Sequence, residues 1–158
     1  MNDRYLYRAM RVDNGEWVEG AYYIEPYTDK YFIIQWNSTG LGFNEFIEVD
    51  GASVCQCTGL KDKNDKLIWE NDIVKEFNSS GDEWNLSQIV FGEYSLNLGW
   101  CAKGIKTLHE YNRRLFNVGF GASEAGKCET IGNIFDNPEL LEEKEYDDLE
   151  ASVEDMER

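Results

Sequence analysis

The chain has 158 residues, of which 42% are hydrophobic and 14% aromatic, and this length corresponds to about one domain. A net charge of −16 argues against non-specific nucleic-acid binding, which needs lysine and arginine to displace counterions, and against a polybasic membrane anchor. No apolar run approaches the about 20 residues that span a bilayer, and Met1–Tyr7 lacks the apolar region of a signal peptide. We therefore expect a cytoplasmic protein with four free cysteines.

The negative charge is concentrated at the C-terminal end of the sequence. Residues 138–158 contain ten acidic and two basic residues, which gives this segment a charge of −8. The preceding 137 residues contain 21 acidic and 13 basic residues, which is also −8. We therefore expect a mildly acidic β domain in residues 1–141, followed by an acidic helical or disordered tail in residues 142–158.

The N-terminal third has the pattern of β-strands. Residues Tyr5–Val12 alternate between two faces, Asp13-Asn14-Gly15 has turn chemistry, and Trp17–Ile24 has strand character, so the segment predicts a hairpin. The aromatic and isoleucine-rich Tyr31–Trp36 predicts a third strand, and Phe43–Val49 predicts a fourth. The high aromatic content favours this interpretation, because flat rings pack well on a pleated sheet.

Strands and loops are also predicted to alternate in the middle of the chain. The polar stretch Asp62–Asp65 predicts a tight turn, Ser79–Asp82 a loop, and Gly119–Gly126 a loop of small residues. The strands that we expect between and after these loops are Leu67–Trp69, Ile73–Phe77, Leu86–Tyr94 and Thr130–Phe135.

Two helices are predicted. The first is Lys103–Phe116, in which four side chains fall near helical spacing, although Gly104 is a poor start; they are Ile105, Leu108, Asn112 and Leu115. The second begins at Pro138, which suits the first helical position, with Asn137 as the cap. Tyr146, Leu149, Val153 and Met156 then give the tail an apolar stripe. This tail is either a weakly ordered solubilising segment or a surface for a partner or a second copy.

No residue pattern in the chain matches a histidine or metal site. His109 is the only candidate for a histidine general base, and its neighbours match no catalytic signature, so we interpret it as a histidine in a helix. Cys55 and Cys57 would share one face of a strand, where both thiols could hold a metal with Cys101 and Cys128. Structural zinc sites use C-x₂₋₄-C pairs, however, and none is present. We therefore predict buried or half-buried thiols, no metal and no cofactor.

Two loop motifs also fail on inspection. Asp62-Lys63-Asn64-Asp65 begins like a calcium loop, but Lys66, Leu67 and Ile73 occupy positions that need Asp or Asn, Gly and Glu. The glycines of Gly119–Gly126 do not complete G-x-G-x-x-G, because Glu124 stands at the third glycine position. We interpret the first segment as a solvated turn and the second as a flexible loop.

Two groups of charged residues remain as candidates for binding. Asp62, Glu70 and Asp72, with Asp65 beside them, could act in acid–base chemistry or bind magnesium, although polar strand ends are the simpler interpretation. We predict no catalytic residue among them.

The second group is the basic patch of Lys103, Lys106, Arg113 and Arg114. Tyr111 and Phe116 interleave with it, and such a surface could bind single-stranded nucleic acid or dock an acidic tail. An ordinary mixed helix face is the simpler interpretation. Arg113 and Arg114 therefore join Asp62, Glu70 and Asp72 as the candidate binding residues.

Two long segments of the chain carry a recognisable motif, residues 58–74, TGLKDKNDKLIWENDIV, and residues 130–141, TIGNIFDNPELL. They are similar to the signature TGLKDKNGK-I-Y-EGDIV and to the closing IGNIYENPELL of the YopX family of phage and prophage proteins, which the chain therefore resembles. Tyr7–Met10 and Trp17–Gly20 resemble its opening hairpin more weakly. Asp65 and Asn71 stand where the family has glycine, and Asp and Asn tolerate positive φ better than most residues, so we expect a conserved backbone.

The resemblance implies a compact β fold and no assigned activity. The fold that we expect is mainly β, an SH3-like barrel or roll with an N-terminal hairpin extension and a short C-terminal α-helix. The recurring residues of the family are glycine, aspartate, asparagine and apolar types, which indicate turn and core chemistry. No catalytic residue is carried over to this chain, because the resemblance supplies none.

The leading functional hypothesis is a phage or prophage accessory protein that acts as a non-catalytic binding or host-interaction module. Its partner would be a host or phage protein, a homo-oligomer is compatible, and membrane or nucleic-acid partners are not expected. One alternative is an acidic mimic of nucleic acid that inhibits a host DNA-binding protein, which predicts carboxylates along one folded face. Another is a metal- or carboxylate-dependent enzyme, which needs a cleft that brings together Asp62, Glu70, Asp72 or His109.

Overall fold

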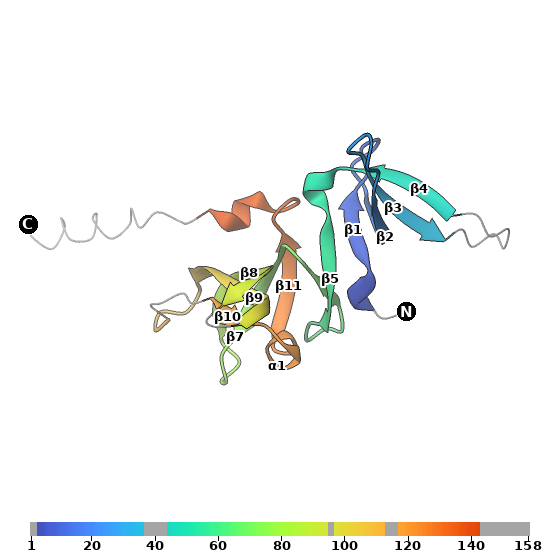
Figure 1. Cartoon of the computed structure of the whole chain (residues 1–158). Coiled ribbons are helices and arrows are strands. Elements are labelled where there is room, and N and C mark those ends of the chain that lie inside the picture. Colours follow the sequence, from blue (N-terminus) through green and yellow to red (C-terminus); the bar gives the residue numbers. More distant parts are fainter. Residues whose placement is uncertain (1–2, 37–43, 95–96, 113–116, 143–158) are drawn as a thin grey trace, which may run out of the picture.

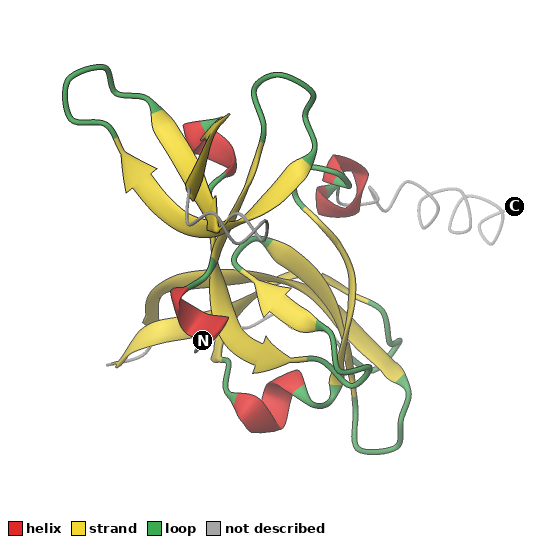
Figure 2. Ribbon diagram, turned by 90° about the vertical axis from the view of Figure 1, so that its right-hand side faces the viewer, coloured by secondary structure: helices red, strands yellow, loops and turns green. Residues whose placement is uncertain are grey.

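The structure is a computed structural model that describes residues 3–36, 44–94, 97–112 and 117–142. Its strands form two antiparallel sheets, one of six strands and one of five. Figure 1 shows two lobes, with β1–β4 in the N-terminal lobe, β7–β11 in the C-terminal lobe, and β5 running between them. Figure 2 shows the same two lobes from the side, with the small helix α1 at the far end of the C-terminal lobe.

The six-stranded sheet has the order β4-β3-β2-β1-β5-β6. Its first four strands pair with their sequence neighbours, and β1 pairs with β5 only through Tyr7 opposite Gln56 and Arg8 opposite Cys55. Short 3₁₀ turns at Asp3–Tyr5 and Gly51–Ser53 flank this lobe. The strands are β1 (Tyr7–Met10), β2 (Trp17–Ile24), β3 (Tyr31–Trp36), β4 (Asn44–Val49), β5 (Cys55–Lys61) and β6 (Leu67–Trp69).

The N-terminal lobe curls around a small core of its own. Ala9, Ile33, Ile47 and Val49 are buried on the inner face of the sheet. The curl brings Arg11, just after β1, to an isolated bridge with Val49 of the far strand β4. A side chain at Gly20 would collide with the backbone of β3, so glycine permits this close pairing.

The five-stranded sheet has the order β10-β9-β8-β7-β11, and the long β8–β9 hairpin is its largest part. The buried residues Ile68, Val74, Ile89, Phe120 and Cys128 belong to its core, so β6 covers one side of this sheet. The elements are β7 (Asp72–Phe77), β8 (Glu83–Tyr94), β9 (Asn97–Thr107), β10 (Val118–Gly119), α1 (Ala122–Ala125), β11 (Cys128–Asn133) and a 3₁₀ turn, η3 (Pro138–Leu141).

The expectation of a mainly β chain is confirmed, whereas a closed barrel is not formed by the described strands, which make two open sheets. The strands predicted over Trp17–Ile24, Tyr31–Trp36 and Leu67–Trp69 have the observed bounds. The positive φ angles expected where the family has glycine are also confirmed, at 65° for Asp65 and 67° for Asn71.

Both predicted helices are wrong in the described residues. The segment expected to begin a helix at Lys103 is the second half of β9, which pairs with β8 as far as Thr107. At the C-terminus, Pro138–Leu141 form a 3₁₀ turn rather than an α-helix, and Glu142 has an extended backbone with φ −72° and ψ 122°. Asn137 makes no side-chain cap. The predicted stripe of the tail lies outside the described residues.

The segment Gly119–Gly126 also differs from the predicted loop. It contains β10 at its start and the one-turn helix α1, whose residue Ala125 is fully buried in the C-terminal core. Among the described residues, no helix is long and apolar enough to cross a membrane.

Candidate functional site

The two lobes meet at a buried ion pair. Nη2 of Arg8 in β1 lies 2.5 Å from Oδ1 of Asp72 in β7, and these side chains are only 13% and 2% exposed. The other oxygen of Asp72, Oδ2, accepts a hydrogen bond from the backbone N–H of Trp69 at 2.8 Å. The Arg8 guanidinium lies 4.7 Å from the ring centre of Trp17 and 5.2 Å from that of Trp69. One carboxylate and two indole rings therefore enclose the cation.

Trp17 makes a second contact between the lobes. Its Nε1 donates a hydrogen bond to Oδ2 of Asp136 at 2.9 Å, and its ring packs edge-on against Phe135 with the centroids 5.7 Å apart. Oδ1 of Asn133 accepts the backbone N–H groups of Phe135 and Asp136, both at 2.9 Å, which holds this turn in place. A Cβ at Gly132 would collide with Asn137, which explains the glycine.

The turn between β6 and β7 is fixed from several sides. The backbone N–H of Asn71 donates to the carbonyl of Ile89 at 2.7 Å, and its Oδ1 accepts from Nε2 of Gln88 at 2.9 Å. The carbonyl of Asn71 accepts the N–H of Ile134 at 3.1 Å. The neighbouring Glu70 is half-buried, and this burial raises the pKa of its carboxyl.

Asp62 organises the turn between β5 and β6. Its Oδ1 accepts the backbone N–H groups of Asn64 at 2.8 Å and Lys66 at 3.0 Å, and its Oδ2 accepts that of Thr130 in β11 at 2.9 Å. Burial raises the pKa of Asp62, but the N–H groups of Thr130, Lys66 and Asn64 lower it more, so its pKa lies below the usual value. The carboxylate thus attaches this turn to the end strand of the C-terminal sheet.

The predicted carboxylate cluster is therefore three separate structural groups. Asp72 pairs with Arg8, Asp62 accepts backbone N–H groups, and Glu70 is half-buried in the turn between β6 and β7. Within the described ranges, no group of three or more histidine, cysteine, aspartate or glutamate side chains could hold a metal ion. Most of these contacts come from residues 58–74 and 130–141, the two segments that resemble the YopX family most clearly. The two segments with the weaker resemblance, Tyr7–Met10 and Trp17–Gly20, pair with each other in the β1–β2 hairpin.

The other sequence candidates lie in the C-terminal lobe or outside the described residues. His109 follows β9 in a loop rather than a helix, with its ring 5.3 Å from that of Trp84 and its Nε2 3.8 Å from Oδ2 of Asp82. Arg113 and Arg114 lie outside the described residues. The four cysteines are buried free thiols, and burial raises the pKa of Cys55 to about 11 and that of Cys128 to about 12.

A small pocket of about 120 Å³ lies between β7 and α1, and both charged and apolar side chains border it. Its lining includes Glu76, whose Oε2 already accepts hydrogen bonds from Oγ of Ser87 at 2.8 Å and from the side-chain amide of Asn85. This pocket contains none of the predicted binding residues. Its lining residues are Glu76, Phe77, Glu124, Lys127 and Cys128.

A surface that the sequence interpretation missed lies on the N-terminal lobe. Tyr23 of β2, Phe32 of β3 and Phe46 of β4 form a triangle of rings, with centroids 6.2 to 6.4 Å apart. Tyr23 is 41% and Phe46 57% exposed. Ile34 pairs with Ala21 and Phe46 and shares their side of the sheet. We call these five residues the outer aromatic face; they are Ala21, Tyr23, Phe32, Ile34 and Phe46.

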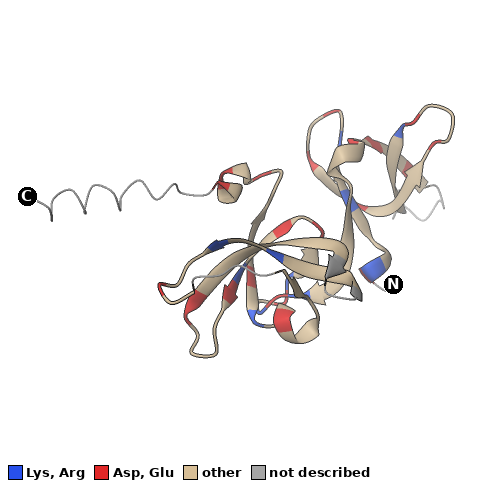
Figure 3. Cartoon of the chain, turned by 60° about the vertical axis from the view of Figure 1, so that its left-hand side comes forward, with Lys and Arg blue, Asp and Glu red and all other residues tan. Residues whose placement is uncertain are grey.

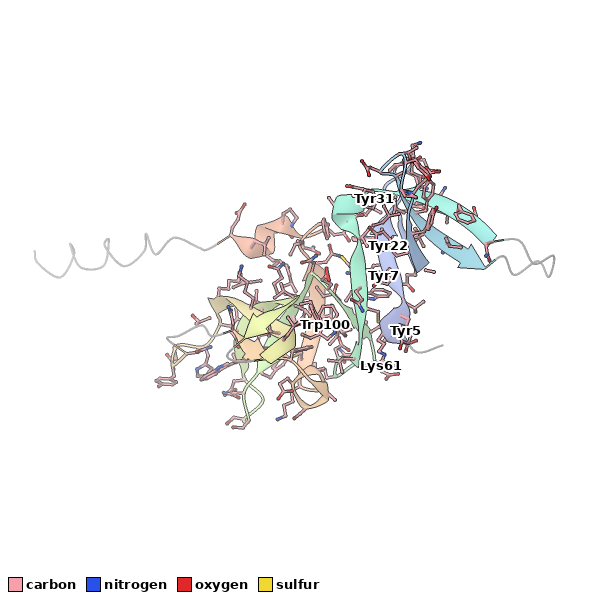
Figure 4. All side chains as sticks on the ribbon, in the orientation of Figure 1. Tyr5, Tyr7, Tyr22, Tyr31, Lys61 and Trp100 are labelled. Atoms are coloured by element: carbon pink, nitrogen blue, oxygen red, sulfur yellow. The ribbon has the colours of Figure 1, made fainter. Side chains whose placement is uncertain are left out.

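The opposite face of the same sheet is already filled. Tyr7, Tyr22 and Tyr31 form a row across β1, β2 and β3 there, with neighbouring rings 5.4 and 6.2 Å apart, and Figure 4 shows them in line. They pack against the buried core of the lobe. The sheet is thus apolar on both faces, and the run Tyr31–Ile34, which contains no charged residue, was the sequence signal for it.

Acidic residues are dense around this lobe. Residues 7–50 contain eight acidic and three basic residues, a net charge of −5 over 44 residues. Residues 51–142 contain 14 acidic and nine basic residues, which is also −5 but over 92 residues. Figure 3 shows that in the C-terminal lobe the two signs are interspersed. The N-terminal lobe therefore has about twice the density of negative charge.

Comparisons with known proteins identify a family and a solved structure. The family model described as "YopX protein" matches residues 6–142. The crystal structure of protein EF1440 from Enterococcus faecalis is similar to this chain, with 23% sequence identity and a TM-score of 0.46. The alignment covers 86% of this chain and 96% of that chain. The search of curated proteins found no match.

Proposed function

We propose that this chain, which belongs to the YopX family, is a non-catalytic binding module that docks another protein on its outer aromatic face. In this proposal it is a phage or prophage accessory protein that acts in the cytoplasm of the host cell. The architecture implied by the resemblance, an SH3-like roll, suits such a role, because small β scaffolds commonly bind partners through exposed surfaces on a rigid frame.

One observation supports the proposal above all others, namely the exposed ring triangle on a sheet whose inner face is complete. An antiparallel sheet with one solvated face normally alternates apolar and polar residues. Here neighbouring outward positions of β2, β3 and β4 hold Tyr23, Phe32, Ile34 and Phe46 instead. Contiguous exposed apolar patches of this kind mark interaction sites on soluble proteins. Aromatic residues are also the types most enriched at the centres of protein interfaces.

The non-catalytic part of the proposal draws support from the roles of the candidate acids. Asp62 and Asp72 are buried and already satisfied by backbone N–H groups and by Arg8. A general acid or base must reach a substrate within hydrogen-bond distance, and these carboxylates are turned toward the protein itself. The nucleic-acid mimic has less support, because the acids of the described part are divided between both lobes and do not follow one folded face (Figure 3).

A matched pair of substitutions tests the proposal. Phe46 and Phe91 are both half-exposed phenylalanines in strands, at 57% and 54%, and each packs edge-on against an aromatic neighbour. With the whole chain as bait in a host lysate, Phe46→Ser is expected to lose the bound partner and Phe91→Ser to retain it. Circular dichroism should show both variants folded. Equal retention of the partner by both variants would remove the outer aromatic face from the account.

A further inference from the structure

We infer that the segment received by the outer aromatic face is basic, with arginine or lysine side chains lying over the exposed rings and beside the carboxylates that border them. This inference rests on the function proposed above and adds the chemistry of the partner.

The strand register places two carboxylates at the border of the outer aromatic face, Glu48 next to the ring of Phe32 and Glu19 next to Ala21. Tyr23, Phe32 and Glu48 are cross-strand neighbours in one row, so Glu48 shares the outer side of the sheet. Glu19 lies two residues before Ala21 on β2, and it is exposed on the same side. Glu48 is 3.5 Å from Lys30, and both side chains are substantially solvated, at 40% and 52% exposure. This weak pair can exchange Lys30 for a cation of the partner.

The charge of the lobe selects against the other occupants. With eight acidic and three basic residues in positions 7–50, the lobe attracts cations and repels anions at long range. The tail of this chain carries −8 in residues 138–158, so it has the wrong sign to cover the face. A second copy would oppose two lobes of −5. A basic segment of another protein is the occupant that complements both the rings and the charge.

The rings can accept cations, and the chain already uses this contact elsewhere. Phe46 stands at 88° to Tyr23 and at 74° to Phe32, so these pairs are not stacked face to face. The face of an aromatic ring is electron-rich and attracts an ammonium or guanidinium group. Within the molecule, Arg8 lies over Trp17 and Trp69, and the Lys63 ammonium lies 3.9 Å from the ring centre of Phe77.

A displayed library of random 12-residue peptides tests the inference with the full chain. The library is selected on the wild-type chain, and the peptides retained by Phe46→Ser are subtracted, with Phe91→Ser as the control bait. We expect the peptides that depend on Phe46 to have a net positive charge, with arginine or lysine next to apolar residues. Binding of such a peptide should weaken roughly 2- to 30-fold in Glu19→Gln/Glu48→Gln, the range for losing two exposed charge pairs.

Each result of the selection has a separate meaning. Neutral or acidic peptides that depend on Phe46 would overturn the basic partner and leave the proposed binding function standing. The basic partner would also be overturned if the selected peptides matched this chain's own tail sequence, or if light scattering showed a dimer that Phe46→Ser abolishes. If no peptide depends on Phe46, the proposed function fails and the inference fails with it. Unchanged binding in Glu19→Gln/Glu48→Gln would also overturn the inference, because it would show that cations of the partner do not lie beside these carboxylates.

Discussion

Removing one charge of the ion pair between the lobes should strongly lower the free energy of unfolding. Asp72→Asn keeps a side-chain oxygen for the Trp69 N–H but removes the charge that faces Arg8. The guanidinium then stays buried between two indole rings without its ion-pair partner, and its Nε already has no hydrogen-bond partner in the described structure. We expect Asp72→Asn to lower the free energy of unfolding by about 3–5 kcal/mol, the usual cost of orphaning one member of a buried pair.

The pair itself is worth much less than this cost. Burial raises the pKa of Asp72 even though the Arg8 guanidinium and the Trp69 N–H lower it, so ionising this carboxyl costs more free energy in the folded chain than in water. The double variant Arg8→Met/Asp72→Asn removes both charges together. We therefore expect it to be more stable than Asp72→Asn alone, with a coupling free energy on the order of 2 kcal/mol in the double-mutant cycle.

Urea unfolding followed by tryptophan fluorescence measures this cycle, because Trp17 and Trp69 flank Arg8. In thermal unfolding the single variant should melt about 6–20 °C lower, at about 2–4 °C per kcal/mol for a chain of this size. Asp13→Asn, which breaks the exposed pair with Arg11, is the control and should change nothing measurable. Additive effects of Arg8→Met and Asp72→Asn would refute the reasoning, since they would show that the two charges do not depend on each other.

Three further predictions concern the carboxyls and thiols. Burial raises the pKa of Glu70 above 4.5, so its charge destabilises the fold at neutral pH and not below pH 4.5. Glu70→Gln should therefore raise the melting temperature at neutral pH only. An equal rise of the melting temperature in acid would contradict this. The pKa of Asp62 lies below 3.8, so the stability that its carboxylate contributes is fully present above pH 3.8 and is lost as the pH falls further. The destabilisation by Asp62→Asn should therefore shrink in strong acid. A difference between the two melting temperatures that stays constant with pH would contradict this. The four buried thiols should resist iodoacetamide until the chain is unfolded, as mass spectrometry would show, whereas rapid labelling of the folded chain would mean that they are accessible.

Local patterns predicted the strands whose signals are contained within their own residues. Trp17–Ile24 and Tyr31–Trp36 are rich in β-branched and aromatic residues and are flanked in the sequence by residue types that favour turns, so their limits could be read from the sequence. The positive φ of Asp65 and Asn71 followed from residues that tolerate that conformation in place of glycine.

The wrong helix at Lys103–Phe116 shows what local patterns omit. Ile105 and Leu108 fit a helical spacing, but Asn97–Thr107 gains a ladder of backbone hydrogen bonds by pairing with β8, and that partner decides its structure. Strong pairing between neighbouring strands is tertiary information, and the spacing of a few apolar residues does not contain it.

The candidate site was mispredicted for a similar reason. Asp72 looked like one member of a carboxylate cluster, but its partner Arg8 is 64 residues away in the sequence. Asp62 likewise accepts a hydrogen bond from the backbone N–H of Thr130, which is 68 residues away in the sequence. The outer aromatic face depends on the register of three strands, which brings Tyr23, Phe32 and Phe46 together. Only the apolar run in β3 indicated it beforehand.

The most direct test of the binding function is site-specific photo-crosslinking. A photoreactive phenylalanine analogue is placed at Phe46 in one sample and at Phe91, its matched control, in another, and the chain is irradiated in a host lysate. We expect a discrete crosslinked protein from position 46 and none from position 91, with the crosslink suppressed by excess wild-type chain. The same pattern of crosslinks from both positions, or a discrete product from position 91 alone, would contradict the claim that the outer aromatic face is the binding surface.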